Sequence, residues 1–461
     1  GDLVVSLTYR GTWLLLRLLG GLACVFPDSR QIVSEMASKY TLSSLNSIEG
    51  MTHLDREKFD SKLRVPCLYV LKNFDKYMST LLRCLGKYLL KLPKLNPVCA
   101  DTNELPSDSC RRILIDPDSL SKVSDLLNSL DVETKFRVDQ CEIAITYDNW
   151  TYEEILRSII PKGLDAVGGF SVIGHIVHLN LKPYLAPYKV LIGEVILDKL
   201  KNIRTVVNKT DTIDNEFRNF SMEILAGDEE TLVTVKEGKC AFKFDFRHVY
   251  WNPRLSSEHM AIANLIPEKS CVFDVFAGVG PFAIPLAKKY CCVYANDLNP
   301  NSHQWLTYNV EKNKTESYVT PYMLDAEDFI KSVIRTQLMK SDHTNVSCKQ
   351  AYVIMNLPAK AYEYLPCFIG LCNDGDQKDL HYQLIIVHLY CFLKCKESIK
   401  KLVDSLSEVF EVNMSPYITN SHCVRSVAPN KEMFRISFEL PPAVLFQSPE
   451  PERKRIKIDL G

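Results

Sequence analysis

The chain has 461 residues, which is enough for two or three domains, and 46% of them are hydrophobic, which is ample for packed cores. The formal net charge is −1, so no overall positive field attracts a polyanion, and any contact with nucleic acid must use local clusters of basic side chains. The 16 cysteines form no Cys-x-x-Cys pair, and no uninterrupted apolar run is long enough to cross a membrane. We therefore expect no zinc site, no membrane span and a reducing compartment.

Residues 1–50 are predicted to be a flexible N-terminus that carries a targeting segment. Its apolar stretch 12–26 is broken by Arg17 and two glycines, which is closer to a mitochondrial presequence than to a secretory signal. At the other end, 443–461 is expected to be a disordered tail, whose basic cluster 453–457 is either a nuclear localisation patch or part of a plain tail. These segments predict the mitochondrial matrix, the cytoplasm and the nucleus as locations.

A small α+β module is predicted over 55–150. Its strands are expected at 63–70, 111–115 and 136–145, and its helices at 73–90 and 120–130. The first helix is amphipathic and basic. Its Lys76, Arg83 and Lys87 are candidate contacts to nucleic-acid phosphates, although a solvated helix face would carry the same residues.

A second α+β module is predicted over 151–248. A helix at 152–160 leads into it, and 170–181 is predicted to be one strand. His175 and His178 in that strand would point to opposite faces, so we expect no metal there.

From 249 to 442, strands alternate with helices, which predicts an α/β domain with a mostly parallel, doubly wound sheet. Four of its strands each lead to a polar side chain: 271–273 to Asp274, 293–295 to Asp297, 321–324 to Asp325, and 351–355 to Asn356. The carboxyl ends of parallel strands meet at one edge of a sheet, so these side chains would line one crevice. Gly278 and Gly280 follow the first strand, where glycine lets the backbone approach a nucleotide-like ligand closely.

The order of these residues favours a class of enzyme. Asp297 alone would suit the ribose of a nicotinamide cofactor. A further polar group for an adenine and an Asn-x-Pro turn that holds a planar base are what S-adenosylmethionine methyltransferases need. The alternative is that Asp297 and Asp325 are helix N-caps.

Five segments carry a resemblance to a known family. The segments 274–282, 296–300 and 355–358 resemble the class I tRNA (guanine-N1)-methyltransferases of archaea and eukaryotes. The segment 249–258 is similar to the family's Tyr-x-x-Pro-Arg-Leu-x-x-Glu motif, and 216–219 to its Arg-bearing motif. The resemblance covers the chain from residue 55 to residue 442.

The resemblance implies a Rossmann-like class I methyltransferase domain preceded by the two smaller modules. It also implies S-adenosylmethionine as the cofactor and methyl transfer to N1 of guanosine 37 in tRNA, next to the anticodon. In eukaryotes, the family's product also feeds wybutosine synthesis. The partner would be tRNA, gripped at its body and anticodon loop by a chain that we expect to be a monomer.

The resemblance also assigns roles to residues. Glu258 would be the general base that takes the N1 proton, and Arg218 would stabilise charge on O6. From the residues alone, the better interpretation of Glu258 is an acid in the first turn of a helix, favoured by the helix dipole, and the resemblance reverses it. Tyr250 would contact the target nucleotide and Asn356 the edge of its base. The remaining implied residues are His259, Asp274, Phe276, Gly278, Gly280, Asp297, Leu298, Asp325, Ala326 and Asn356 for the cofactor, and Arg254 and Pro358 for the substrate.

Two other functions remain open at this point. The first is a class I methyltransferase that acts on another RNA base or on a protein amide, because 356–358 also resembles an Asn-Pro-Pro-Tyr turn. The residue after Pro358 is Ala359 rather than an aromatic, which argues against an exocyclic amine as the target. The second is a non-catalytic RNA-binding protein with a degenerate cofactor fold, against which the intact polar strand ends argue.

Overall fold

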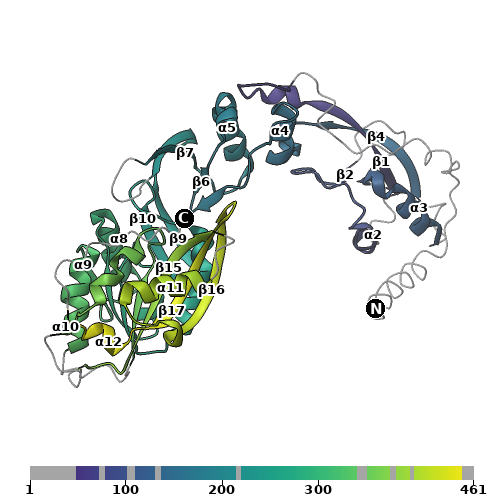
Figure 1. Cartoon of the computed structure of the whole chain (residues 1–461). Helices are drawn as coiled ribbons and strands as arrows, with labels where there is room; N and C mark the ends of the chain where they lie inside the picture. Colours follow the sequence, from purple (N-terminus) through teal and green to yellow (C-terminus); the bar gives the residue numbers. More distant parts are fainter. Residues whose placement is uncertain are drawn as a thin grey trace. The chain divides into compact units, whose positions relative to one another are not determined.

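The computed structural model describes residues 48–71, 78–100, 110–129, 136–213, 220–339, 350–373, 380–394 and 399–448. The chain divides into two compact units, coloured along the sequence in Figure 1. The N-terminal unit comprises 1–168 with 181–201, and the C-terminal unit comprises 169–180 with 202–461. Most of the predicted targeting segment, residues 449–461 of the predicted tail, Lys76 and Arg218 lie outside the described residues. The start of the predicted disordered tail is wrong, because 443–445 is helical and Val444 and Leu445 are buried in the core.

This division cuts through 151–248, which we predicted as one module. Helices α4 (Tyr152–Ile159) and α5 (Lys189–Lys199) pack against each other in the N-terminal unit, whereas the strands of 169–180 and 202–248 belong to the C-terminal unit. Asp198 fastens α5 to its unit, because its Oδ2 accepts hydrogen bonds from Arg56 at 2.7 and 3.0 Å and from the Tyr147 hydroxyl at 3.1 Å.

The N-terminal unit contains an antiparallel sheet in the order β2-β3-β1-β4. Its strands are β1 (Ser61–Leu71), β2 (Val98–Ala100), β3 (Cys110–Leu114) and β4 (Phe136–Ile145). In β1, Val65 and Cys67 face one side and Leu68 and Val70 the other, and all four are buried. Helices α2 (Met78–Leu85) and α3 (Leu120–Ser129) cover the side of Leu68. Short 3-10 turns complete the unit: η3 (Arg56–Phe59), η5 (Pro117–Ser119), η7 (Tyr147–Asn149) and η8 (Pro183–Tyr188).

The C-terminal unit contains a four-stranded sheet in the order β5-β6-β7-β8 and a separate hairpin of β9 and β10. Their bounds are β5 (Ser171–Ile173), β6 (Ile176–Leu179), β7 (Thr205–Ile213), β8 (Phe220–Gly227), β9 (Leu232–Glu237) and β10 (Cys240–Asp245). The single strand predicted over 170–181 is wrong. Gly174, with a φ of 59°, turns the chain between β5 and β6, so His175 lies in a turn and only His178 in a strand.

A seven-stranded sheet is the centre of the C-terminal unit, in the order β13-β12-β11-β14-β15-β17-β16. Its strands β15, β16 and β17 are labelled in Figure 1. The strands are β11 (Cys271–Asp274), β12 (Cys292–Asn296), β13 (Val319–Tyr322), β14 (Gln350–Met355), β15 (Leu384–Lys394), β16 (Ile418–Ala428) and β17 (Lys431–Glu439). The first five in this order are parallel, and the last two pair antiparallel. This confirms the mostly parallel, doubly wound sheet that the sequence predicts.

Helices cover both faces of this sheet because alternate residues of the strands point to opposite sides. Cys271 and Phe273 of β11 face one core, and Val272 faces the other. Helices α6, α7 and α8 lie on the side of Val272. The helices are α6 (Ser256–Leu265), α7 (Ala283–Ala287), α8 (Pro300–Lys312), α9 (Ala326–Asp328), α10 (Arg335–Met339), α11 (Ile399–Phe410) and α12 (Pro442–Leu445). The 3-10 helices of this unit are η9 (Pro253–Leu255), η11 (Ala361–Phe368) and η13 (Ser415–Tyr417), and η10 (Phe329–Ile334) is a π-helix.

The free side of β10 is closed by two asparagines, Asn309 in α8 and Asn313 at its C-cap. The side-chain amide of Asn309 bonds both the N–H and the C=O of Lys243, at 2.7 and 3.1 Å. One helical turn later, Asn313 does the same for Ala241, at 3.0 and 2.8 Å. The two amides thus replace a neighbouring strand and fasten the hairpin to the larger sheet's helical layer.

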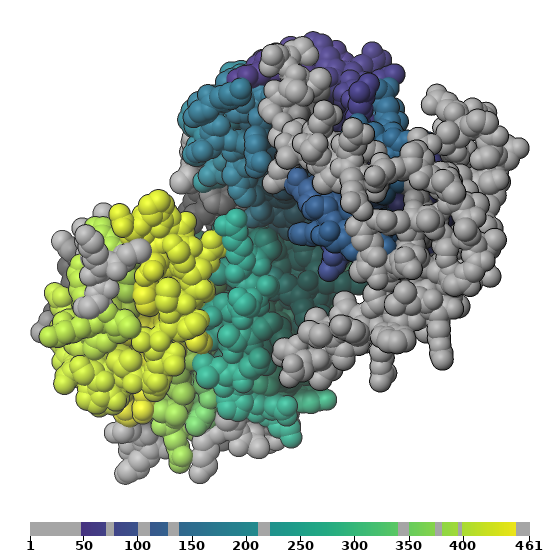
Figure 2. Space-filling model, turned by 90° about the vertical axis from the view of Figure 1, so that its right-hand side faces the viewer, coloured from purple at the N-terminus to yellow at the C-terminus, as the bar shows by residue number. Residues whose placement is uncertain are grey.

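Two strand predictions need correction. β13 lies at 319–322 rather than 321–324, so Asp325 does not end the strand directly and instead caps α9. β16 was not predicted, because it is an exposed edge strand of largely polar residues without an apolar alternation. It forms part of the yellow surface in Figure 2. No helix in the described ranges is long and apolar enough to cross a membrane.

Candidate active site

The two glycines after β11 serve different purposes. Gly278 has a φ of 55°, and a Cβ built on it would meet no atom within 4 Å. Gly280 has a φ of 96°, and its Cβ would lie 2.9 Å from Leu306 Cδ1 and 3.0 Å from Ile284 Cδ1. Both positions favour glycine for their backbone conformation. Gly280 is also required by packing, whereas Gly278 borders open space that a ligand can enter.

Asp274 ends β11 in a fully buried position. Neither of its carboxylate oxygens has a hydrogen bond of good geometry from the described residues, and the N–H of Phe276 is the one backbone donor that favours its ionised form. Burial, reinforced by the negative charge of Asp297, raises the pKa of Asp274 to about 8. A buried polar group without a partner is costly, so this carboxyl group is suited to a ligand that supplies donors or a positive charge.

Asp297 follows β12 and reaches back to the glycine turn. Its Oδ2 accepts from the N–H of Gly278 at 2.8 Å, and its Oδ1 from the N–H of Asn299 at 2.9 Å. Burial raises the pKa of Asp297, and the hydrogen bonds oppose that effect. The carboxylate is therefore held beside Gly278 with lone pairs left for a further donor.

Asp325 and Asn356 stand on either side of these two acids in the sheet order. Asp325 caps α9, because its Oδ1 accepts from the N–H of Glu327 at 2.8 Å, as the N-cap alternative proposed. Asn356 follows β14 directly, and its Oδ1 is buried without a partner in the described part of the chain. Asn296 aligns the strand ends: it donates to the carbonyls of Val275 and Leu324 at 3.2 and 3.1 Å.

Asp274, Asp297, Asp325 and Asn356 are called the strand-end set from here on. The parallel pairings β13–β12, β12–β11 and β11–β14 bring them to one edge of the sheet, in the order Asp325, Asp297, Asp274, Asn356. Two of the four carry buried oxygens without partners, and Gly278 borders open space. These features fit S-adenosylmethionine, which brings an ammonium and a sulfonium charge, ribose hydroxyls and an adenine amine.

Glu258 lies in the first turn of α6 but points at the sheet. The buried stripe of α6 consists of Glu258, His259, Ile262 and Ala263, and Glu258 itself is 3% exposed. Its Oε1 accepts a hydrogen bond from the Tyr390 hydroxyl at 2.8 Å and lies 3.2 Å from Nε of Arg435. Its Oε2 lies 3.8 Å from Nε2 of His422.

Tyr390, Arg435 and His422 stand side by side on three neighbouring strands. Tyr390 of β15 pairs with Arg435 of β17, and Arg435 pairs with His422 of β16. Directly opposed residues of antiparallel strands project to the same face, so the three form one row, called the cross-strand row below. On the other side of β15, the last parallel pair is Met355 with Leu389, which places Asn356 at the level of Tyr390. Glu258 therefore sits over the sheet beside the strand-end set.

Other predicted residues lie around this arrangement. His259 is buried, with Nδ1 2.8 Å from Glu237 Oε2 and its ring 4.8 Å from that of Phe282, so its polar contact is to the hairpin. Phe276 packs edge-on against Tyr364 at 5.6 Å. Leu298 is exposed, and Ala326 is buried in α9.

The predicted substrate contacts are accessible. Tyr250 is 53% exposed, and Asn252 donates to its hydroxyl at 3.4 Å. Arg254 is exposed in η9, within the same segment, and Pro358 is half-buried after Asn356. Arg83 and Lys87 are exposed at and after the end of α2, in the N-terminal unit. The predicted helix 73–90 is shorter in the described residues, where it covers 78–85.

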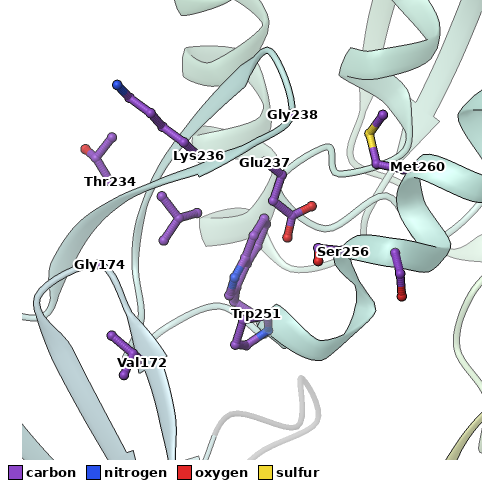
Figure 3. A pocket seen from close by; sticks show the side chains of 12 residues that line it. Val172, Gly174, Thr234, Lys236, Glu237, Gly238, Trp251, Ser256 and Met260 are labelled. Carbon is purple, nitrogen blue, oxygen red and sulfur yellow. The ribbon is translucent and has the colours of Figure 1, made fainter. Parts of the chain in front are cut away.

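A pocket of about 560 Å³ opens on the other side of α6 (Figure 3). Ser256, Ser257 and Met260 line it from the exposed side of the helix, and the Glu237 side chain extends toward Trp251 inside it. None of the predicted catalytic or cofactor residues lines this pocket. The site that the sequence predicts is therefore the sheet edge and not this hollow.

Sequence reasoning missed the cross-strand row. Tyr390 lies in an apolar strand, where a tyrosine attracts no attention, and Arg435 and His422 lie on strands that come together only in the fold. An arginine inside a largely apolar strand segment, 433–438, is the one signal that could have marked the row, because a buried cation needs a partner.

Comparisons with known proteins identify the family. A family model described as the TRM5/TYW2 methyltransferase domain matches residues 233–412, and one described as the TYW2 N-terminal domain matches 152–231. A Xenopus tropicalis protein named tRNA (guanine(37)-N(1))-methyltransferase is 42% identical over 421 residues, which cover 88% of this chain and 83% of that protein. The Homo sapiens protein of the same name is 41% identical over 411 residues, covering 87% and 79%.

Solved structures share the fold. Trm5b from Pyrococcus abyssi superposes with a TM-score of 0.55 at 24% identity, covering 81% of this chain and 99% of that chain. The aTrm5 structure in complex with tRNALeu gives 0.54 at 23% identity with the same coverage. The identity to the Xenopus tropicalis and Homo sapiens relatives over most of their length shows that the chain belongs to the tRNA (guanine(37)-N(1))-methyltransferase family.

Proposed function

We infer that this chain transfers a methyl group from S-adenosylmethionine to N1 of guanosine 37 in tRNA, next to the anticodon. Relatives with this activity in their name are more than 40% identical over most of the chain. In the structure, the burial and the contacts of Glu258 carry this inference. A buried carboxylate stands beside the strand-end set, with one oxygen held and the other without a hydrogen bond from the described residues.

The strand-end set is where the cofactor would be held. Asp297 suits the ribose hydroxyls, Asp325 the adenine amine, and Gly278 the methionine part, as the sequence predicts. Asp274 carries unsatisfied acceptors at the centre of the set. When bound, S-adenosylmethionine supplies an electrophilic methyl group.

Glu258 supplies the missing base. Guanine N1 carries a proton at neutral pH, so N1 becomes a nucleophile only as that proton leaves. Oε2 of Glu258 is the oxygen suited to accept it, because Tyr390 and Arg435 already occupy Oε1. A positioned base of this kind contributes roughly 10²- to 10⁴-fold in rate.

Three further residues would contact the guanine as its N1 proton leaves. Negative charge develops on O6, and Arg218 is our candidate to stabilise it with paired donors. Asn356, whose Oδ1 has no partner among the described residues, would accept from the edge of the base. The exposed Tyr250 would stack on or bond the target nucleotide.

The tRNA would be bound through shape and phosphate contacts. Guanosine 37 must leave its stack to reach a buried carboxylate. Lys76, Arg83 and Lys87 are candidate phosphate contacts in the N-terminal unit, where the last two are exposed. The location of the protein and its monomeric state remain proposals, which expression of fusions to 1–47 and to 443–461 and sedimentation of the purified chain would test.

The test of the function is transfer of a labelled methyl group to an unmodified tRNA transcript, followed by nucleoside analysis. We expect 1-methylguanosine from a transcript with G at position 37 and no product from a matched transcript with A there. A product methylated at N2 or N6, or label in protein, would replace this function with the alternative methyltransferase. Absence of any transfer would favour a non-catalytic RNA-binding protein.

A further inference from the structure

The environment of Glu258 poses a problem that the proposed function leaves open. A buried base that has taken a proton must lose it again before the next turnover. Glu258 is 3% exposed, so water has little direct access to its carboxyl group. The proton therefore needs a route out that does not pass through the bound substrate.

The cross-strand row offers that route. Tyr390 is buried and donates to Oε1, and Arg435 is 6% exposed and forms an ion pair with the same oxygen. Burial, together with the charge of Glu258, raises the pKa of Tyr390 well above its usual range, so its hydroxyl stays a donor. Neither group can carry a proton away, because tyrosine keeps its own and arginine is permanently charged.

His422 is different from its two neighbours. Its side chain is 52% exposed, while its Nε2 lies 3.8 Å from Oε2 of Glu258. The His422 ring thus faces bulk water on one side and, on the other, lies near Oε2 of Glu258, the oxygen that accepts no hydrogen bond from the described residues. The 3.8 Å separation is longer than a hydrogen bond, and a rotation of the exposed ring or one bridging water would close it.

We propose that Tyr390 and Arg435 fix the carboxylate of Glu258 through Oε1, and that His422 relays the proton from Oε2 to solvent. This inference rests on the proposed role of Glu258 as the base. In the relay, the N1–H bond breaks as the Oε2–H bond forms. The Oε2–H bond then breaks as the proton moves to Nε2 of His422, and the imidazolium releases a proton to water.

The charged and titratable groups around the relay are few in the described residues. Glu258 meets Tyr390 from β15, Arg435 from β17 and His422 from β16. Asp274 acts on Tyr390 through space from β11. On α6 itself, His259 is paired with Glu237 and is directed toward the hairpin. His422 is therefore the one exposed titratable side chain within 4.0 Å of the Glu258 carboxylate in the described part of the chain.

The decisive variant is His422→Ala, with Ser421→Ala as its matched control. Both positions are exposed on β16, but Ser421 pairs with Ile436 and projects to the opposite face. We expect His422→Ala to lower the turnover rate about tenfold, because slower proton loss to water replaces the relay. Added imidazole should restore the rate, and Ser421→Ala should leave it unchanged. A merely structural histidine would not respond to imidazole.

Two more variants distinguish a failure of the relay from a failure of the proposed function on which it rests. In a Glu258→Gln background, His422→Ala should have no further effect, since both act on the same proton. Tyr390→Phe should lower the single-turnover rate with unchanged Kd values for cofactor and tRNA. A wild-type chain that makes no 1-methylguanosine would refute the proposed function. A wild-type chain that makes it, with His422→Ala at the wild-type rate from pH 6 to 8 or without rescue by imidazole, would overturn the relay alone.

Discussion

The strand-end set and the cross-strand row lie in one sheet but differ in what their polar atoms face. In the strand-end set, Asp274 and Asn356 hold buried oxygens that no described residue satisfies. In the row, Tyr390 donates to Oε1 of Glu258 at 2.8 Å and Arg435 forms an ion pair with the same oxygen at 3.2 Å, while Nε and Nη1 of Arg435 have no hydrogen-bond partner among the described residues. Buried oxygens without partners mark where a ligand completes the structure, whereas the two contacts to Oε1 hold a carboxylate in place for chemistry. The sheet thus carries a binding edge and, beside it, the residues that position the Glu258 carboxylate of α6.

The strongest test of this contrast is Glu258→Gln. The amide keeps the shape and still accepts from Tyr390, but it cannot take a proton. We expect the single-turnover rate to fall roughly 10²- to 10⁴-fold, with cofactor and tRNA affinity near normal, because the base acts on the barrier and not on ground-state binding. Quench-flow measurement of methyl transfer checks this, and raising the pH should partly rescue the variant. A wild-type rate at pH 7 would move the base elsewhere, to a water held by Asn356 or to Asp214 or Glu216, which both lie outside the described residues.

Asp297→Ala should have the complementary effect. It removes a carboxylate of the strand-end set, so we expect cofactor affinity to weaken by about 1.5–3 kcal/mol, the size of charge-assisted hydrogen bonds. Calorimetric titration with S-adenosylmethionine measures the loss, and Glu258→Gln serves as the control that should bind normally. Equal affinity in the two variants would erase the distinction between binding edge and base.

The two glycines sharpen the contrast within the binding edge. Gly280→Ala places a methyl group 2.9 Å from Leu306 Cδ1, so we expect it to destabilise the fold by about 1–3 kcal/mol. A Cβ at Gly278 meets no atom within 4 Å, so Gly278→Ala should lower the free energy of unfolding by about 1–2 kcal/mol, through its backbone conformation alone. Relative to the stability that each variant loses, Gly278→Ala should weaken cofactor binding more than Gly280→Ala does. Thermal unfolding with and without cofactor separates the two. Identical profiles would mean that Gly278 does not border the ligand.

Asp274 predicts a proton signature for the binding edge. Its pKa of about 8 means that it is mostly protonated at pH 7 in the free protein. A positively charged cofactor favours the ionised form, so binding should release up to one proton and tighten as the pH rises toward 8. Calorimetry in buffers of different ionisation enthalpy counts the protons, and Asp274→Asn should release none. No proton release from the wild type would place the positive charge away from this carboxyl group.

The same group affects stability with a defined sign. In the unfolded chain, Asp274 titrates near the ordinary value of about 3.9, so between pH 4 and 8 the folded state binds more protons than the unfolded state. The contribution of this group is therefore full below pH 4 and is lost as the pH rises through 8. Asp274→Asn should flatten that decline in the free energy of unfolding, measured by denaturant titration at several pH values.

Substitutions in the N-terminal unit should affect neither the strand-end set nor the cross-strand row. Replacing Arg83 and Lys87 with glutamine should lower the slope of log affinity for tRNA against log salt by about 1 to 2. Cofactor affinity and the single-turnover rate at saturating tRNA should not move. Filter binding at several salt concentrations measures the slope, and an unchanged slope would show that these exposed cations face solvent.

The sequence predicts the strand-end set but not the row, for a physical reason. Asp274 and Asn356 each follow a short apolar strand in a parallel sheet, so local pattern alone places them at one edge. The contact of Glu258 with Tyr390 and Arg435 joins residues 132 and 177 positions apart, counted from their numbers, and depends on the register of antiparallel strands. The polar edge strand that carries His422 has no apolar alternation to reveal it.

The two asparagines beside β10 have a consequence for the behaviour of the protein in solution. A strand with open N–H and C=O groups is a template on which another chain can add a strand, and such edges lead to aggregation. Asn309 and Asn313 occupy those groups on β10 with side chains of the same molecule. Replacing both asparagines with leucine would preserve α8 and leave the edge of β10 open. We therefore expect the variant to self-associate through β10 of the hairpin.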